Sequence, residues 1–446
     1  MRRAAAYRHR SSGRLSIALL GLLGLLASPA CERTPGDAAT QPPGRAEAGG
    51  GEGGEARGDE TIDPAAWADR LAHRYVILDG HVDVPIRVHG ATRDGGPAPA
   101  VHDHTDDGDF DWARARAGGL DAPFMSIYTP AELEAEPGAS KAFAERSIAF
   151  VTGLAAEHPD RFALAVTPQQ VRENFEAGRI SLAMGMENGS PIEGDLANLR
   201  GFYLQGVRYI TLTHSKDNHI CDSSYDDRHT HQGLSPFGRE VVAEMNRLGV
   251  MVDVSHVSDQ TFWQVMELSA VPVIASHSSC RAFTPGFERN MSDEMIVALA
   301  EHGGVIQINF GGGFISAAYR AAEEEARTEI GKLLDEHRVD WQSPEGKAII
   351  ADYRASHPMP RVDVSTVADH IDHVVELVGI DHVGLGSDFD GVGDSLPEGL
   401  KDVSMYPNLI RVLLERGYTE DAIEKICGAN VLRVWQAVED HAAARR

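Results

Sequence analysis

Short apolar runs of strand length recur along the chain, and each is bounded by Gly, Pro or polar residues. The stretches between them carry apolar residues at helical spacing. One such stretch begins at Ser235-Pro236, where serine suits a helix cap and proline suits the first helical position. Strands that alternate with helices predict an α/β fold, namely a (β/α)8 TIM-type barrel. The eight runs lie at about 75–83, 120–128, 180–187, 207–213, 250–255, 271–276, 303–310 and 382–388.

Other segments refine this alternation. Further amphipathic helices are predicted after Ser258 and from Thr366 onwards. The short run FALAVT at 162–167 leaves a ninth strand open. Residues 317–357 are polar, helix-prone and longer than a plain connection needs. We expect a helical insertion there, before the last strand, that either covers the site or forms a subunit contact.

Most of the predicted strands end in a residue that can bind a metal or move a proton. Taken alone, each has an ordinary explanation, such as a hydrogen-bonded histidine or a turn aspartate. Because the carboxyl ends of barrel strands meet at one rim, the repeated pattern predicts a single site. The residues are His81 and Asp83, Glu187, His214, His256, His277 and Asp388, with Asn309 after the seventh run.

The residue types at these ends favour a pair of metal ions. His81 and Asp83 lie two positions apart on a strand, so their side chains point to the same side and can hold one cation. His256 and His277 end consecutive strands and can hold a second cation, with Glu187 as the bridge. Imidazole and carboxylate ligands without thiolates favour zinc over manganese, cobalt or iron.

The two remaining residues are candidates for the chemistry itself. Two zinc ions that share a water would lower its pKa towards about 7 and make a bridging hydroxide available. Asp388 would take the proton of the attacking water and deliver it to a leaving amine. His214 is interpreted as a non-ligand that hydrogen-bonds the oxyanion of the intermediate. Four other histidines lie in polar loops and are interpreted as surface residues: His102, His104, His229 and His231.

Charge and cysteine content limit the class of partner. The chain of 446 residues has 67 acidic and 41 basic residues and a net charge of −26, which argues against nucleic acid as a partner. Beyond Cys31, the chain has only three cysteines, Cys221, Cys280 and Cys427. So sparse a set is no disulfide framework, although one pair stays open.

The first sixty residues are interpreted as targeting and linker sequence. Residues 1–30 have a basic start and the apolar run LSIALLGLLGLLA, which is typical of a signal peptide. Small residues before Cys31 resemble a bacterial lipoprotein cleavage box with the lipid on Cys31; ordinary cleavage after Ala30 is the alternative. Residues 31–60 are a Gly/Pro/Glu-rich tether, and 61–440 are the folded domain. We therefore expect an exported protein of the bacterial cell envelope, in the periplasm or anchored at the membrane.

With these residues in view, the chain resembles the membrane dipeptidase (renal dipeptidase) family of zinc peptidases, which are amidohydrolase-type metal barrels. The match runs from Tyr75 to about Trp435. It rests on DGHVD at 79–83, GMENG at 185–189, RYITLTHS at 208–215, the run 233–258, SHSS at 276–279, Arg289-Asn290 and GIDHVGLGSDFDG at 379–391.

The resemblance implies roles for the residues and properties for the protein. It places His81, Asp83 and Glu187 on one zinc and Glu187, His256 and His277 on the other. Asp388 is the catalytic carboxylate, His214 contacts the substrate, and Arg289 pairs with the substrate's terminal carboxylate. It also implies a homodimer, acceptance of a D-residue at the C-terminal position and opening of β-lactam rings. Mammalian members carry a cysteine where this chain has Lys216, so a disulfide from that position is not expected. They carry an aromatic residue where this chain has Gly311, so a wider or differently shaped pocket is expected.

These features predict an exported zinc-dependent dipeptidase that hydrolyses one peptide bond. One alternative is another binuclear-metal amidohydrolase that acts on a cyclic amide, lactone, β-lactam or phosphotriester. Many such sites use His-x-His on the first strand and a modified lysine as bridge, so His81-x-Asp83 with Glu187 argues against them. A second alternative is a non-catalytic metal-binding lipoprotein, against which the complete set of ligands and Asp388 argue.

Overall fold

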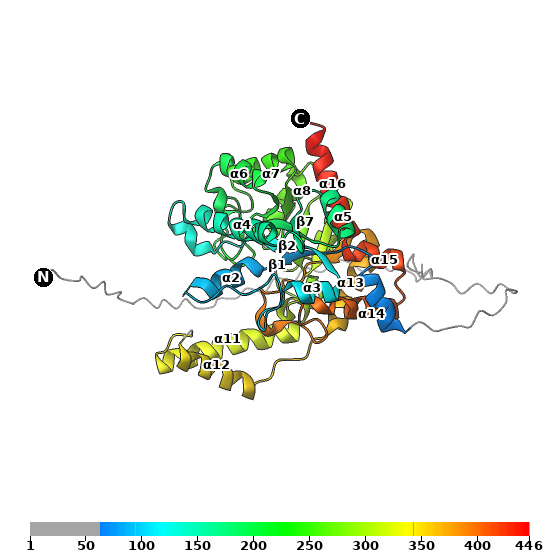
Figure 1. Ribbon diagram of the computed structural model, residues 1–446. Helices are drawn as coiled ribbons and strands as arrows, with labels where there is room; N and C mark the ends of the chain where they lie inside the picture. The colour runs from blue at the N-terminus through cyan, green and yellow to red at the C-terminus, as the bar shows by residue number, and fades with distance from the viewer. Residues whose placement is uncertain (1–62, 94, 342, 446) are drawn as a thin grey trace, which may run out of the picture. The chain divides into compact units, whose positions relative to one another are not determined.

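Eight parallel strands close into a barrel, which confirms the predicted (β/α)8 fold (Figure 1). The computed structural model describes residues 63–93, 95–341 and 343–445. The predicted signal peptide, Cys31 and the tether 31–60 lie outside the described residues. The barrel strands are β1 (Ile77–Val82), β2 (Leu120–Ser126), β4 (Ile180–Glu187), β5 (Val207–Thr211), β6 (Met251–Asp253), β7 (Ile274–Ser278), β8 (Val305–Ile308) and β9 (Val383–Leu385).

The order of the strands shows how the barrel closes. Each strand pairs with the next from β4 to β9, β9 pairs with β1, β1 with β2, and β2 with β4. The ninth strand that the sequence left open is β3 (Phe162–Leu164). It pairs with residues 180–182 of β4, whereas β2 pairs with residues 183–185 of the same strand. The strand β3 therefore extends one edge of β4 without entering the closed ring.

The helices begin where the sequence provides caps. The Ser235 hydroxyl accepts a hydrogen bond from the Gly238 amide at 2.9 Å, and α7 follows directly. The helix α13 begins two residues before the predicted Thr366, because Asp363 is its cap. The longer helices are α1 (Pro64–Ala72), α2 (Val84–Arg93), α3 (Trp112–Gly118), α4 (Ala139–Glu157), α5 (Pro168–Glu176), α6 (Leu196–Leu204), α7 (Pro236–Leu248), α8 (Asp259–Leu268), α9 (Asp293–Glu301), α11 (Ala317–His337), α12 (Pro344–Ser356), α13 (Val364–Val378), α14 (Tyr406–Glu415) and α16 (Asn430–Ala443).

The predicted insertion forms a pair of helices between β8 and α13. The short α10 (Gly312–Ile315) leads into α11, and α12 lies beside α11 on the outside of the barrel (Figure 1). Tyr319 is the only buried residue that α11 contributes, and Gly346 is the only one from α12. Most of this pair is therefore exposed, and its contact with the barrel lies near the amino end of α11.

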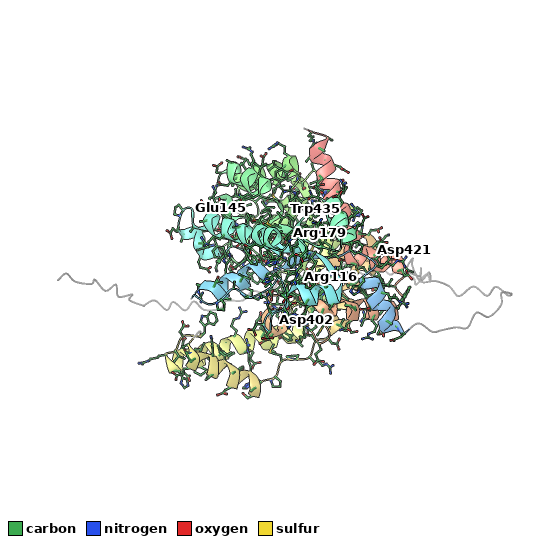
Figure 2. All side chains as sticks on the ribbon, viewed as in Figure 1. Arg116, Glu145, Arg179, Asp402, Asp421 and Trp435 are labelled. Atoms are coloured by element: carbon green, nitrogen blue, oxygen red, sulfur yellow. The ribbon has the colours of Figure 1, made fainter. Side chains whose placement is uncertain are left out.

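The amino-terminal end of the barrel is filled with apolar side chains. The first residues of several strands, among them Leu78, Met251 and Val305, form one cluster with α16. Trp435 of α16, labelled in Figure 2, belongs to this cluster, and its ring centroid lies 5.2 Å from that of Phe124 on β2. The short α15 (Glu420–Glu424) and the π-helical turn Lys425–Ala429 lead into α16.

The described residues also show the state of the cysteines and the length of the apolar helices. Cys221, Cys280 and Cys427 are buried free thiols, so the pair that the sequence left open does not form among them. No helix in the described part of the chain is long and apolar enough to cross a membrane.

Candidate metal centre

The six predicted strand-end residues and Asp83 come together at the carboxyl rim of the barrel. Three overlapping groups have their potential ligand atoms within 4.8 Å of one another. These groups are His81 with Glu187 and His277, Glu187 with His214 and His256, and His81 with Asp83 and Asp388. Residues as far apart in the sequence as His81 and Asp388 therefore share one site, as barrel geometry requires.

Glu187, the last residue of β4, lies at the centre of this cluster. Its Oε2 is 3.3 Å from His81 Nε2, and its Oε1 is 3.1 Å from His256 Nε2 and 3.4 Å from His277 Nε2. The Ser126 hydroxyl of β2 donates to Oε2 at 3.2 Å. The two carboxylate oxygens thus face different histidines, which is the arrangement that a bridging ligand needs.

Several polar atoms of the cluster fit a cation. His81 Nε2 and Asp83 Oδ1 are buried without a hydrogen-bond partner, and His81 Nε2 lies 3.5 Å from Asp83 Oδ2. His256 Nε2 and His277 Nε2 lie 2.8 Å apart and both face Glu187. Native proteins rarely leave buried polar atoms unpaired, so unpaired acceptors turned towards each other suit metal ligation. The donors are imidazole nitrogens and carboxylate oxygens, which bind divalent metal ions in proteins.

Hydrogen bonds from beneath the site fix the tautomers of two histidines. The Tyr209 hydroxyl donates to the Gly80 carbonyl at 3.0 Å, so it accepts from His81 Nδ1 at 2.8 Å. The proton of His81 then sits on Nδ1, and the lone pair of Nε2 points into the site. A hydrogen bond at the other ring nitrogen, here with Tyr209, orients a metal-binding histidine.

A second chain of hydrogen bonds orients His277. The Ser276 hydroxyl donates to Asp253 Oδ2 at 2.6 Å and lies 2.8 Å from His277 Nδ1. The hydroxyl therefore accepts from His277 Nδ1, and His277 Nε2 is left as a lone-pair donor for a cation. The Asp253 carboxylate also accepts from the amides of Ser255 and Ser276, which holds it in place.

A glycine makes room for one of these supporting residues. The ring of Tyr209 passes so close to Gly185 of β4 that a Cβ there would lie 1.9 Å from a ring carbon. Gly185 is two residues before Glu187 on the same strand. The motif GMENG therefore provides both the central carboxylate and the space for the tyrosine that orients His81.

The electrostatics of the cluster favour positive charge at its centre. Burial would raise the pKa of Glu187, but His81, His214 and the hydrogen bonds from His256 and His277 outweigh it and hold that pKa well below its usual range. Burial would lower the pKa of His81, but Tyr209, Glu187 and Asp83 outweigh it and raise that pKa well above its usual range. A cation between Glu187 and Asp83 can take the place of this proton.

The histidines on the other side of Glu187 are neutral. Burial, and then Arg289, lowers the pKa of His256 well below its ordinary value. Burial, followed by His81 and Arg289, does the same to the pKa of His277. Neutral imidazoles are the form that binds metal ions.

Asp388 follows β9 and forms a group with His81 and Asp83. Asn309 Nδ2, after β8, donates to Asp388 Oδ2 at 2.8 Å. Burial, and then the like charge of Asp83, raises the pKa of Asp388 to about 7. Its backbone is left-handed, with φ 63°, and His256 is left-handed too, with φ 69°. Non-glycine residues in this conformation are strained and cluster at functional sites.

His214 lies at the open side of the cluster. Its Nε2 is 3.5 Å from Glu187 Oε1, slightly farther than the 3.1–3.4 Å of the three predicted histidine ligands. Its side chain is 22% exposed, against 6% for His256 and 1% for His277. Tyr128 contacts it edge-on, with ring centroids 4.9 Å apart. The greater exposure fits a residue that meets the substrate.

Arg289 is buried beside the cluster, with a relative exposure of 3%. Its Nη1 donates to Ser278 Oγ and its Nη2 to the His277 carbonyl, both at 2.7 Å. Its Nε is buried and has no hydrogen-bond partner. A buried guanidinium with an unpaired N–H is suited to bind an anion.

The supporting roles of Tyr209, Asp253 and Ser276 were not predicted from the sequence. These residues lie in the apolar runs RYITLTH, VMVDVSH and VPVIASH. A polar residue inside an apolar strand is the sequence feature that could have pointed to them. At Gly311, where a wider or differently shaped pocket was expected, a Cβ would lie 2.8 Å from Val392 and 3.0 Å from Phe314. Those two side chains fill the space beside the glycine.

Comparison with known proteins identifies the family. The sequence pattern of the membrane dipeptidase family, peptidase family M19, matches residues 65–446. The chain belongs to the membrane dipeptidase family. This result confirms the resemblance seen in the sequence and makes the protein a metallo-dipeptidase.

Relatives of this membrane dipeptidase occur in fungi and bacteria. An uncharacterised dipeptidase of Schizosaccharomyces pombe is 33% identical over 387 residues, which cover 83% of this chain and 84% of that protein. The dipeptidase ataJ of Aspergillus terreus is 33% identical over 399 residues, with 84% and 87% covered. The crystal structure of the probable dipeptidase PvdM from Pseudomonas aeruginosa is 27% identical, with a TM-score of 0.70, and the match covers 85% of this chain and 99% of that one.

Proposed function

We propose that this metallo-dipeptidase uses two zinc ions to hydrolyse the single peptide bond of a dipeptide. The ligands would be His81, Asp83 and Glu187 for one ion and Glu187, His256 and His277 for the other. The observation that carries this assignment is the position of Glu187, whose two oxygens face the two histidine groups. When bound, the ions would activate a water and polarise the scissile carbonyl.

Three residues beside the proposed ligands would transfer the proton and bind the oxyanion: Asp388, Asn309 and His214. Asp388, with a pKa raised to about 7 by burial and by Asp83, can accept a proton near neutral pH and return it to the leaving amine. Asn309 holds the orientation of this carboxyl. His214, the exposed histidine of the cluster, would donate a hydrogen bond to the developing oxyanion.

The terminal carboxylate of the substrate would bind to Arg289. Two of its nitrogens are held by Ser278 and by the His277 carbonyl, which leaves the buried Nε–H for a ligand. An anchor for the terminal carboxylate at a fixed distance from the bridging carboxylate limits the length of the chain that fits. We propose that this anchor selects dipeptides over longer peptides.

Three further proposals rest on the sequence pattern and on the resemblance. They are export with lipid attached to Cys31 and location in the bacterial envelope, a homodimer, and acceptance of a D-residue at the C-terminal position. Intact mass of the membrane-extracted protein would test the lipid on Cys31.

The experiment that tests the proposed function is a substrate panel with zinc present. We expect hydrolysis of dipeptides with an L- or a D-residue at the C-terminal position, and rates at least tenfold lower on the matching tripeptides. A chromogenic β-lactam serves as a separate arm. Equal rates on tripeptides, or hydrolysis of the β-lactam with none of any dipeptide, would refute the proposal.

A further inference from the structure

Three aromatic side chains, Tyr225, Phe287 and Phe314, form a rim beside the metal centre. The Tyr225 ring centroid lies 5.9 Å from that of His256 and 6.1 Å from that of Phe287. The Phe287 and Phe314 centroids are 5.8 Å apart. Tyr225 is 41% exposed, whereas Phe287 is buried. This aromatic rim therefore connects a predicted metal ligand with the protein surface.

Two arginines stack on neighbouring rings of the aromatic rim. The guanidinium carbon of Arg289 lies 5.3 Å from the Phe314 centroid, and that of Arg320 lies 3.5 Å from the Phe287 centroid. Arg289 comes from the loop after β7, but Arg320 comes from the first turn of α11, in the helical insertion. The insertion thus adds a second guanidinium to the aromatic rim that Arg289 also contacts.

The guanidinium of Arg320 is available to a ligand. Stacking on Phe287 covers a face of the planar group, and its N–H donors point outward along the edges. The side chain is 30% exposed, and it forms an ion pair with Glu324, which is 59% exposed and one turn along the same helix. Exposed ion pairs of this spacing are weak, so a substrate carboxylate can compete with Glu324.

The aromatic rim brings the two arginines to one place. Arg320 stacks on Phe287 and Arg289 on Phe314, and these two rings lie 5.8 Å apart. Tyr225, 6.1 Å from Phe287, lies on the surface side of the same rim. A substrate held by Arg289 would place the side chain of its C-terminal residue along the aromatic rim.

We propose that Arg320 is a specificity-determining residue that binds an acidic side chain on the C-terminal residue of the dipeptide. The inference rests on the proposed function, in which Arg289 holds the terminal carboxylate. A glutamate or aspartate at that position presents two carboxylates, and the aromatic rim carries two guanidinium groups to receive them. The chemical class of the preferred substrate is thus a dipeptide with an acidic C-terminal residue.

The test compares isosteric substrates in the zinc-loaded full-length enzyme. We would measure kcat/KM for Ala-Glu, Ala-Gln and Ala-Ala, with both configurations of the C-terminal residue. The wild type should prefer Glu over Gln by about tenfold, the discrimination that one charge-assisted hydrogen bond of about 1.4 kcal/mol supplies. In Arg320→Gln the preference should fall to about one.

Two further variants separate specificity from general damage. Arg354→Gln removes the same charge from α12, where Arg354 faces Asp394, and should keep the preference for glutamate. Glu324→Gln removes the competing carboxylate and should raise that preference. Because the ratio of two rates is taken within one preparation, a poorly folded fraction cancels.

The outcomes distinguish the two proposals. A Glu-to-Gln ratio that is the same in the wild type and in Arg320→Gln, while dipeptides are hydrolysed, overturns the role of Arg320 alone. A wild type that hydrolyses none of the dipeptides refutes the proposed function, and the inference about Arg320 with it.

Discussion

Asp388 combines three features that single residues rarely share. Its backbone is left-handed, its carboxyl is buried, and its pKa is raised to about 7 by burial and by the charge of Asp83. Such strain and such a pKa are tolerated where the chemistry requires them. The carboxyl can therefore exchange a proton with a substrate at neutral pH.

Replacing Asp388 with asparagine should separate catalysis from folding. Asparagine tolerates the left-handed backbone and keeps an oxygen for Asn309, so the fold and the metal content should persist. Loss of the proton carrier should lower kcat by roughly 10²–10⁴-fold. Steady-state kinetics and elemental analysis of the same preparation check this. A kcat within threefold of wild type would exclude the role.

Tyr209 should act on metal affinity through His81. Tyr209→Phe removes the acceptor that keeps the His81 proton on Nδ1, so the ring is free to turn or to change tautomer. Zinc affinity, measured by competition with a chelator, should fall about 10–100-fold. Tyr353→Phe on the exposed α12 is the matched control and should leave the affinity unchanged. Equal affinities in the two variants would contradict the orienting role.

At the residue scale, the sequence predicts the candidate metal ligands but not the residues that orient them. His81 and Asp83 could be predicted because strand alternation places both side chains on one side. The bond from His81 to Tyr209 could not, because it joins residues 128 positions apart and depends on the space beside Gly185.

At the scale of elements, β4 contributes most to the site. It carries Glu187 at its end and Gly185 two residues before, and it pairs with β2 on one side and β5 on the other. Any side chain at Gly185 would displace the Tyr209 ring. The stability of β4 and the geometry of the metal centre are therefore linked.

Gly185→Ala should lower both the stability of the protein and its zinc content. The new Cβ would overlap Tyr209, and overpacking of this kind costs about 1–3 kcal/mol. Urea unfolding should show this loss, and zinc content should fall with it. Gly331→Ala in α11 meets open space and should instead gain about 0.5–1 kcal/mol, since alanine favours helix. A Gly185→Ala protein as stable as wild type would contradict the proposed crowding.

Sequence patterns predicted some boundaries of helices and strands correctly and missed others. The start of α7 was predictable because Ser235 and Pro236 are both local signals. The start of α13 was misplaced by two residues, because the cap is Asp363 and the helix begins at Val364, ahead of the apolar repeat that starts at Val367. The pairing of β3 with only the first half of β4 depends on where β2 reaches β4, and no local pattern records that.

At the scale of the whole molecule, the two ends of the barrel have opposite chemistry. The amino-terminal end is closed by apolar residues around Trp435, and the carboxyl end gathers carboxylates and histidines around Glu187. The sequence predicted the barrel and its polar rim because parallel strands bring their ends together. It left open the role of the insertion, because only the packing shows that Arg320 reaches the aromatic rim.

Chelation should destabilise the whole protein. Without cations, the carboxylates of Asp83, Glu187 and Asp388 repel one another inside the site. Free zinc at a hundred times its dissociation constant should stabilise the fold by about 2.7 kcal/mol relative to the metal-free form. Thermal unfolding with and without chelator measures this, and zinc should restore the melting temperature. A melting temperature that is the same with and without zinc would contradict a site built to hold cations.

The most direct test of the account is the number of zinc ions bound per chain, measured by elemental analysis of the zinc-loaded wild type and of Glu187→Gln. The bridging position of Glu187 predicts two ions in the wild type and fewer than two in the variant, because the amide lacks the charge that both ions share. Unchanged zinc content in Glu187→Gln, or fewer than two ions in the wild type, would contradict the binuclear centre.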